Sequence, residues 1–411
     1  MTGPTDLPTL PGAPLGGLLA EAKALQPRTV ELRRKIHRQP EVGLDLPLTQ
    51  AAVREAVSDL PLEIHAGKST TSLTAILRGA APGPSVLLRG DMDALPLTED
   101  TGVAFASEVK GAMHACGHDL HTAMLASAAR LLAAHVDQLA GSVVFMFQPG
   151  EEGHHGARHM IHEGVLDAAG SRVTRALAVH VWANAPSGRV SCRPGPMMAS
   201  SDAFTVLVTG KGGHGSAPQH AIDPVPAAAA MVGALQTMIT RRVDVFDPAV
   251  LSVTRISAGT TSNVIPETAE LEGTFRAQSA RTRALVRAEL PKVCEAIGTA
   301  YGCRVAVDFR PGYPPTVNDP GEAARVLTLA HTLFGPEHAE EWADPIMGAE
   351  DFSYVLQRVP GAMAFVGACP PGVGPDEAPP NHSNLVTFDE DAMPHGVALY
   401  AAYALDALGT E

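Results

Sequence analysis

The sequence has 411 residues, of which 45% are hydrophobic and only 4% are aromatic, and its formal net charge is −14. Because single hydrophobic cores stop growing at roughly 250–300 residues, a chain of this length is expected to form two domains. The acidic balance, without a run of Lys or Arg, argues against nucleic acid or an anionic membrane as a partner.

The first half of the sequence alternates helical patterns with short apolar strands. Residues 1–14 are expected to be a flexible tail, and helical periodicity follows near 15–37 and 48–60. Four apolar runs have the length of strands: 73–79, 85–90, 142–148 and 176–182. A helix is predicted at about 119–135, between two of these runs. Apolar strands that alternate with helices indicate an α/β domain around a mostly parallel sheet, buried on both faces.

The pattern changes after a stretch rich in Pro, Gly and Ser near residue 192. A strand, a helix, two strands, a helix and a strand are predicted in turn, over 203–210, 223–242, 250–277, 280–301 and 303–309. This β-α-β-β-α-β order is that of a ferredoxin-like α+β sandwich. Helix and strand alternation then resumes, so we predict that 193–312 is inserted into a larger domain formed by 15–192 and 313–411.

Side chains that can bind metal ions gather where the predicted strands of the larger domain end. Five segments carry them: Asp91 with Asp93, Cys116 with His118, Glu151 with Glu152, His180, and His382. In open α/β sheets, ligands bind outside the carboxyl ends of the strands. We therefore expect these segments to meet at one edge of one sheet and to form a site there.

The kinds of side chain indicate which metals such a site would hold. Thiolate, imidazole and carboxylate together suit Zn²⁺, Mn²⁺, Co²⁺ or Ni²⁺ and disfavour Ca²⁺ and Mg²⁺. Cys116 and His118 are two residues apart, so one turn could aim both inward, and a thiolate could bridge two cations. A structural zinc knuckle would need four Cys or His ligands, and no second Cys pair lies nearby in the sequence.

The adjacent glutamates Glu151 and Glu152 follow the strand predicted at 142–148. Two neighbouring carboxylates point in different directions, so one can bind a metal ion while the other faces the water that the ion activates. That second carboxylate could take a proton from the water and pass it to a leaving amine. The alternative is a pair of solvated surface glutamates, which the residues alone leave open.

Eight motifs, in their order along the chain, resemble the peptidase M20 family and specifically its amidohydrolase branch. They are RGDMDALP, MHACGHDLHTAM, QPGEEG, HVW, GKGGHGSAP, TSNVIP, GTFRA and MGAEDF. The branch includes hippurate hydrolases, N-acyl-amino-acid amidohydrolases and auxin-conjugate hydrolases. The resemblance runs from about residue 25 and is specific for the branch, not for the substrate.

The resemblance implies a zinc-exopeptidase-like catalytic domain that binds two divalent cations (Zn, Mn, Co or Ni) and an inserted lid and dimerisation domain. By this resemblance, five residues bind the cations: Cys116 as the bridge, His118, Glu152, His180 and His382. Glu151 would be the general base and acid. Related branches have a metal-binding histidine at the position of Asp91, so Asp93 is expected to support the site without binding a cation.

In the inserted domain, the resemblance implies that His214 and Asn263 reach the substrate, often across a dimer, to stabilise the oxyanion and hold the substrate carboxylate. Arg276 is a further candidate for holding the substrate carboxylate. His154 and His155 stand where small residues are usual in the family, and no role is assigned to them. A homodimer or larger homo-oligomer formed through the inserted domain is expected.

The predicted activity is metal-dependent hydrolysis of small N-acyl-L-amino acids, giving a carboxylic acid and an amino acid. A dipeptidase, a carboxypeptidase or an N-acyl-diaminopimelate deacylase could use the same site. Two other classes stay open: a thiol hydrolase with Cys116 as nucleophile and His118 or His121 as base, and a metal-binding protein without catalysis. The low aromatic content offers no evident platform for an aromatic acyl group.

The compartment is predicted from cysteine usage and from apolar patterning. Five widely scattered cysteines do not resemble a disulfide framework, and the start of the sequence lacks the pattern of a secretory signal. No apolar stretch approaches the roughly 20 residues of a membrane span. A cytoplasmic protein is therefore expected.

Overall fold

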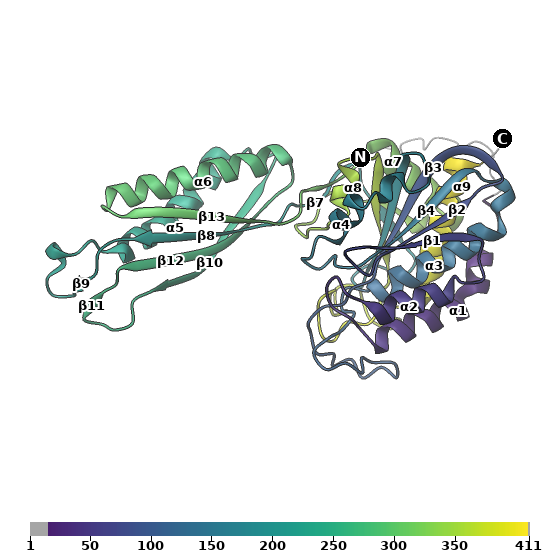
Figure 1. Ribbon diagram of the computed structural model, residues 1–411, viewed down its shortest axis with the longest axis horizontal. Coiled ribbons are helices and arrows are strands. Elements are labelled where there is room, and N and C mark those ends of the chain that lie inside the picture. Colours follow the sequence, from purple (N-terminus) through teal and green to yellow (C-terminus); the bar gives the residue numbers. More distant parts are fainter. Residues whose placement is uncertain (1–14, 410–411) are drawn as a thin grey trace. The chain divides into compact units, whose positions relative to one another are not determined.

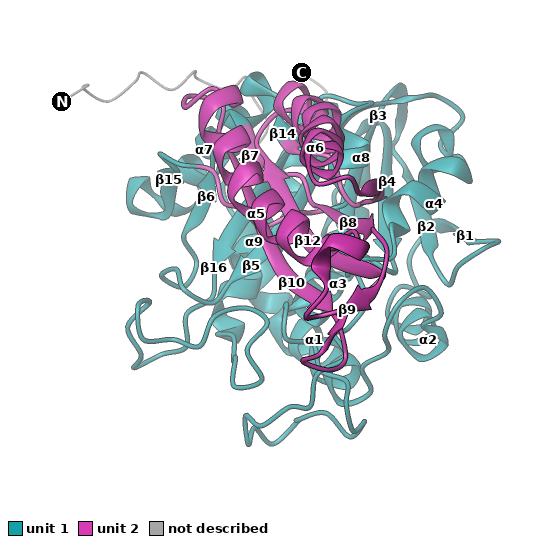
Figure 2. Ribbon diagram, turned by 90° about the vertical axis from the view of Figure 1, so that its left-hand side faces the viewer, with its two compact units in different colours: residues 1–195, 317–344, 351–411 teal, residues 196–316, 345–350 magenta. Residues whose placement is uncertain are grey.

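The computed structural model describes residues 15–409, which form two compact units (Figure 2). Unit 1 comprises the chain up to Gly195, Val317–Asp344, and the residues from Asp351 onward. Unit 2 comprises Pro196–Thr316 and Pro345–Glu350. The tail predicted at 1–14 lies outside the described residues.

An eight-stranded sheet forms the centre of unit 1 (Figure 1). Its strands, in spatial order, are β1 (Leu62–Ala66), β2 (Leu73–Arg78), β4 (Ala140–Gln148), β3 (Ala81–Asp91), β5 (Val173–Trp182), β16 (Gly361–Gly367), β6 (Val190–Cys192) and β15 (Ala339–Glu341). The central strands β4, β3, β5 and β16 run parallel to one another, so the α/β prediction is confirmed. The run at 73–79 instead pairs antiparallel with β4. Only two residues separate β2 from β3, and a parallel crossover needs a dozen or more.

Three long helices of unit 1 pack against one another: α1 (Leu18–Arg38), α3 (His118–Ala134) and α9 (Met393–Leu408). α3 and α9 also pack on the sheet, and their Ala- and Leu-rich sequences favour helix while filling the apolar core. The other α-helices described in unit 1 are α2 (Pro47–Ala56), α4 (Gly156–His162), α7 (Pro320–Phe334) and α8 (Ser353–Leu356). In the described part of the chain, none of the helices combines the length and apolar character that a membrane span requires.

Unit 2 is built on a four-stranded antiparallel sheet (Figure 1). Its strands, in spatial order, are β10 (Ala249–Ala258), β12 (Thr268–Ala277), β8 (Asp202–Thr209) and β13 (Arg304–Pro311). The helices α5 (Pro224–Arg242) and α6 (Ala280–Ala300) pack on this sheet, and the side chains of Asp223 and Ser279 cap their N-termini. The predicted ferredoxin-like order of elements is therefore present.

Short strands complete the two units. β9 (Gly213–His214) pairs with β11 (Val264–Ile265), and β7 (Gly195–Met198) pairs with β14 (Thr316–Asn318). The prediction that all of 313–411 belongs to the larger domain is wrong for residues 313–316 and for Pro345–Glu350, which lie in unit 2. For Pro345–Glu350 the reason is a long-range backbone pairing: the N–H of Ile346 donates to the carbonyl of Met197 at 3.0 Å.

The carboxyl ends of three central strands of unit 1 lie at the same edge of the sheet. The parallel registers place Asp91 opposite Gln148 and Arg89 opposite Ala178. The loops that follow β3, β4 and β5 therefore start beside one another. This edge carries the side chains that the sequence singled out.

Candidate metal centre

A glycine turn leads into α3 at this edge. Gly117 has a φ of +87°, and a Cβ atom there would lie 2.3 Å from Cγ2 of Val181. A larger residue would be strained and would clash, so the turn requires glycine. The turn places Cys116 just before the helix and His118 as its first residue.

Five donor side chains come together here: three from loops, one from the first residue of α3, and one from strand β5. The Cys116 Sγ lies 3.4 Å from the Nε2 of His180 and 3.2 Å from the Nε2 of His382. The Glu152 Oε1 lies 3.3 Å from the Nε2 of His382 and 4.0 Å from the Nε2 of His118. Two groups that could hold a metal ion share Cys116, one with His118 and His180 and one with Glu152 and His382.

The histidines are oriented as metal ligands are. The Nδ1 of His118 donates to the carbonyl of Asp93 at 2.8 Å, and the Nδ1 of His180 donates to the carbonyl of Val181 at 2.7 Å. Such bonds on Nδ1 leave Nε2 to face a metal ion. The Nε2 of His118 is buried and has no hydrogen-bond partner among the described residues, which fits a position prepared for a cation.

His382 is held in a strained conformation. Its φ is +71°, in the left-handed region that residues other than glycine rarely adopt, and its N–H donates to the carbonyl of Ala115 at 2.8 Å. Hydrogen bonds to Cys116 and to Glu152 raise the pKa of His382 to about 10. Positive charge is therefore stabilised at this end of the cluster.

Asp93 fixes the turn that carries the glutamate pair. Its Oδ1 accepts from the N–H of Glu151 and its Oδ2 accepts from the N–H of Glu152, both at 2.9 Å. Glu151 is only 6% exposed, and its carboxylate lies within 4.8 Å of the ligand atoms of His118 and Glu152. The alternative of two solvated surface glutamates is therefore wrong.

Asp91 and His121 form a buried pair beneath the cluster. The Nδ1 of His121 lies 2.6 Å from the Oδ1 of Asp91, and its Nε2 accepts from the N–H of Val181 at 2.8 Å. Both ring nitrogens are engaged, so His121 has none left to act as a base for Cys116. Burial opposes ionisation of Asp91, yet the Arg89 guanidinium, 2.5 Å away, and the nearby His118 hold its pKa well below the usual range.

Two supporting residues were not identified from the sequence. The Asn381 side chain donates to the carbonyls of Cys116 at 3.2 Å and Val181 at 3.1 Å, and so ties its own loop to the turn before α3 and to strand β5. Arg89 bonds both Asp91 and Asp351, and it is 1% exposed. The sequence does contain a signal for Arg89, which is a charged residue within an apolar strand. Such a charge is rarely buried unless it is paired, so a buried partner could have been expected.

Comparison with known proteins identifies the family. Residues 87–406 match the model described as peptidase family M20/M25/M40. The chain belongs to this family. The predicted M20 membership is confirmed, and with it the prediction of an enzyme that hydrolyses amides.

Three curated relatives are similar over most of their length. Thermostable carboxypeptidase 1 of Saccharolobus solfataricus is 37% identical over 389 residues, covering 94% of this chain and 96% of the relative. IAA-amino acid hydrolase ILR1-like 4 of Arabidopsis thaliana is 37% identical over 379 residues, covering 91% and 84%. N-acetylcysteine deacetylase of Bacillus subtilis is 35% identical over 391 residues, covering 94% and 99%. These names confirm the amidohydrolase branch.

A solved structure supports both the fold and the kind of site. The Bacillus subtilis YXEP protein, described as a dinuclear metal binding peptidase from the M20 family, superposes with a TM-score of 0.81. It is 32% identical, and the match covers 94% of this chain and 99% of that one. This M20 chain is thus a metal-dependent hydrolase with residues that can hold metal ions.

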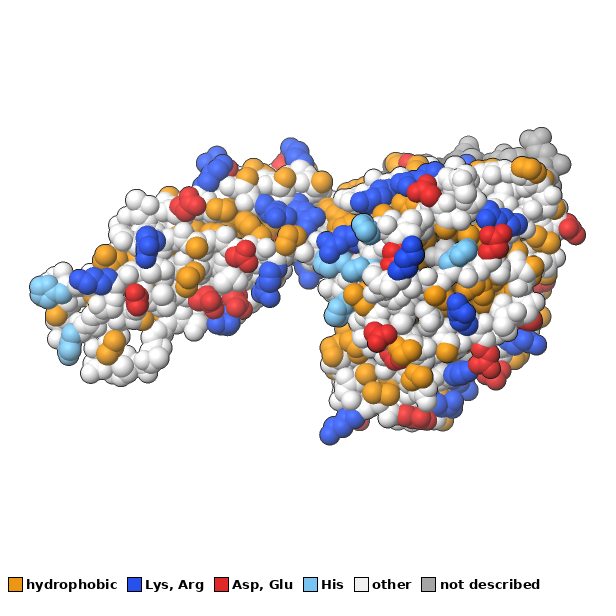
Figure 3. All heavy atoms as spheres, viewed as in Figure 1, with side chains coloured by type: hydrophobic (Ala, Val, Ile, Leu, Met, Phe, Trp, Pro, Cys, Tyr) orange, Lys and Arg blue, Asp and Glu red, His pale blue; other side chains and the backbone are white. Residues whose placement is uncertain are grey.

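The substrate-binding residues predicted in the insertion fall into two places. His214 of β9 pairs with Val264 of β11, and Asn263 immediately precedes Val264. His214 and Asn263 therefore lie side by side. Both are exposed, and Figure 3 shows histidine side chains at this end of unit 2. Arg276 lies near the other end of β12, nine residues beyond Glu267, which bonds Gly210 at the β9 end. At ~3.3 Å per residue, Arg276 is about 30 Å from the first pair within the unit.

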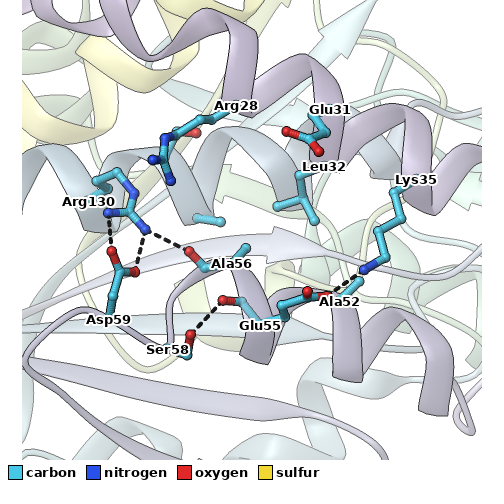
Figure 4. Close-up of a pocket in the computed structure, with 12 residues that line it drawn as sticks. Arg28, Glu31, Leu32, Lys35, Ala52, Glu55, Ala56, Ser58, Asp59 and Arg130 are labelled. Carbon is cyan, nitrogen blue, oxygen red and sulfur yellow. Dashed lines mark hydrogen bonds and ion pairs between the residues drawn. The ribbon is translucent and has the colours of Figure 1, made fainter.

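A separate cavity of about 360 Å³ lies between α1, α2 and α3 (Figure 4). Two ion pairs line it: the Lys35 Nζ lies 2.5 Å from Glu55, and Arg130 lies 2.6 Å from Asp59. No Cys or His lines this cavity. It offers neither a nucleophile nor a set of metal ligands, and the chemistry lies at the sheet edge.

Proposed function

We propose that this M20 protein hydrolyses N-acyl-L-amino acids to a carboxylic acid and a free amino acid, with two divalent cations as cofactors. The observation that carries the proposal is the pair of donor groups that share Cys116, with the buried carboxylate of Glu151 beside them. The names of the Bacillus subtilis and Arabidopsis thaliana relatives support the substrate class.

The cations would be held by five residues: Cys116, His118, Glu152, His180 and His382. A set of one thiolate, three imidazoles and one carboxylate favours Zn²⁺, Mn²⁺, Co²⁺ or Ni²⁺ over Ca²⁺ or Mg²⁺. When bound, such cations supply Lewis acidity to the substrate carbonyl and to water.

Glu151 is the proposed general base and acid. It takes a proton from the attacking water and returns it to the leaving nitrogen, which departs as the amine of the amino acid. Asp93 acts through the backbone: by accepting from the N–H groups of Glu151 and Glu152, it fixes both carboxylates relative to the cluster. It is a positioning residue in this proposal.

Unit 2 is the proposed lid, in which His214 and Asn263 stabilise the oxyanion and Arg276 holds the carboxylate. Within one copy of unit 2, Arg276 is about 30 Å from the other two residues. A single small substrate that contacts all three would require a second copy of the chain. We therefore include a homodimer, or a larger homo-oligomer, in the proposal.

A carboxypeptidase is the second candidate, favoured by the name of the Saccharolobus solfataricus relative. Peptide cleavage would use the same donors and the same proton transfer. The two activities differ in the group on the acyl side of the scissile amide, which is a free aminoacyl group in a dipeptide and a neutral acyl group in an N-acyl amino acid.

Metal-dependent cleavage of paired substrates tests the proposal. The protein would be stripped with a chelator and assayed before and after addition of Mn²⁺ or Zn²⁺, on N-acetyl and N-benzoyl amino acids and on dipeptides with the same C-terminal residue. We expect no activity after chelation, its return with metal, and a kcat/KM at least tenfold higher for the acyl amino acids. Faster cleavage of the dipeptides would favour the carboxypeptidase, and activity that survives chelation would favour a thiol hydrolase.

A further inference from the structure

The only two tryptophans of the chain meet in unit 1. Trp342 stacks on Phe365 with ring centroids 4.9 Å apart and 24° between the planes. Trp182 meets the same phenylalanine edge-on at 5.4 Å, and the two tryptophan rings are 6.2 Å apart. The low aromatic content of the sequence gave no sign of this cluster, because its members come from β5, from β16 and from the residue after β15, which only the folded sheet brings together.

The aromatic cluster is continuous with the metal centre. Phe365 of β16 is the register partner of His180 on β5, and their ring centroids are 5.3 Å apart. Trp182 lies two residues beyond His180 on the same strand, so both side chains project from the same face of the sheet. The Nε2 of His180 is 3.4 Å from the Sγ of Cys116. Phe365 therefore contacts both the donor residue His180 and the two tryptophans, and links the aromatic cluster to the metal centre.

The cluster differs from an ordinary part of the core in its exposure. Phe365 is buried, whereas Trp182 and Trp342 are both partly exposed. Along β5, Val179 and Val181 alternate with His180 and Trp182, and these two valines belong to the apolar core on the opposite face of the sheet. A partly exposed pair of large rings on a buried aromatic floor is typical of a surface that receives an apolar ligand.

We propose that Trp182 and Trp342 form the wall of a subsite that takes a planar aromatic ring on the acyl arm of the substrate. This inference rests on the proposed function, since it names the acyl group which that activity would accept. The two residues determine specificity and take no part in proton transfer or cation binding.

The charges next to the tryptophans assign the wall to the acyl arm rather than to the substrate carboxylate. Glu341 directly precedes Trp342 and would repel a carboxylate. The two nearby cations are engaged: Arg189 lies 3.9 Å from Glu340, and Arg193 donates to the carbonyls of Trp342 at 3.3 Å and Ala343 at 3.4 Å. A neutral ring is the part of an N-acyl amino acid that suits this surface.

Acyl selectivity is the first test. The ratio of kcat/KM for an N-benzoyl amino acid to that for its N-acetyl counterpart would be measured in the metal-loaded protein. We expect Trp342→Leu, which keeps an apolar side chain but removes the ring, to lower this ratio about tenfold, because stacking is lost with part of the buried area. The control Tyr301→Leu removes a partly exposed aromatic residue of unit 2 and should leave the ratio within twofold.

Tryptophan emission is the second test and needs no turnover. Because both tryptophans lie in the cluster, a ring bound there should change the emission of the Glu151→Gln variant in a saturable way. We expect N-benzoyl-L-amino acid to give this change and the N-acetyl counterpart to give little. Trp342→Phe in the same background should reduce it.

The outcomes separate the inference from the function on which it rests. An unchanged selectivity ratio in a folded Trp342→Leu protein, or an emission that N-benzoyl-L-amino acid leaves unchanged, would overturn the subsite. Failure of the wild-type protein to hydrolyse any acyl amino acid would instead overturn the proposed function. In that event, a saturable emission change would still locate ring binding at the tryptophans.

Discussion

Replacing Glu151 by Gln is expected to lower kcat by about 10²–10⁴-fold, the range attributed to a general acid or base. The amide keeps the size of the side chain but cannot take a proton from water. Because Glu151 lies beside the two donor groups that share Cys116 and is a member of neither, the variant should bind as much metal as the wild-type protein. Turnover and metal content, measured on the same preparations, check this result.

The neighbouring residue supplies the matched control for that prediction. Glu152→Gln makes the same chemical change one position along, in a side chain that lies 3.3 Å from the Nε2 of His382. We expect this variant to lose metal as well as activity. If Glu151→Gln kept more than a tenth of the wild-type kcat, or if it lost metal as Glu152→Gln does, Glu151 would not be the base.

Replacing Cys116 by Ala should have an effect of similar size for a different reason. Both donor groups contain the Cys116 sulfur, so its removal weakens both at once. Loss of a residue that merely supports a metal ligand already costs about 10–100-fold in affinity or activity. We therefore expect at least a 100-fold loss of kcat/KM and fewer than two bound metal ions per chain, measured by elemental analysis.

Two further variants show whether the sulfur acts as a ligand or as a nucleophile. Cys116→Asp replaces it with a carboxylate, whose two oxygens can also bind two cations, and should recover part of the metal content and activity. Cys369→Ala, at another cysteine of unit 1, should resemble the wild-type protein in both respects. Full metal content in Cys116→Ala together with complete loss of activity would point to a thiol nucleophile.

Local sequence patterns were enough to predict most of the elements. The helix predicted at 119–135 forms at His118–Ala134, and the one at 280–301 forms at Ala280–Ala300, because their apolar periodicity is local, as is the Ser279 cap of the second. The insertion predicted at 193–312 corresponds to Pro196–Thr316 of unit 2. The assignment of Pro345–Glu350 was missed, since it depends on a backbone bond between residues about 150 positions apart.

The same distinction between local and long-range features applies to the site. The convergence of Cys116, Glu152 and His180 followed from the rule that parallel strands end at one edge of the sheet. The same rule did not predict that both ring nitrogens of His121 are hydrogen-bonded, because this depends on where β5 places Val181 relative to α3. The meeting of the two tryptophans likewise depends on sheet order, which places β16 between β5 and β6. Residue types and spacing predict what lies at the edge, whereas pairing between distant strands decides how it is held.

The central claim is that two cations share the sulfur of Cys116. Anomalous diffraction from crystals grown with Zn²⁺ tests it most directly, because it locates each ion without reference to activity. We expect two peaks, both at the ~2.3 Å typical of zinc–sulfur bonds from the Cys116 Sγ, one beside His118 and His180 and one beside Glu152 and His382. A single closed four-ligand site, or peaks that lie away from Cys116, would contradict the account.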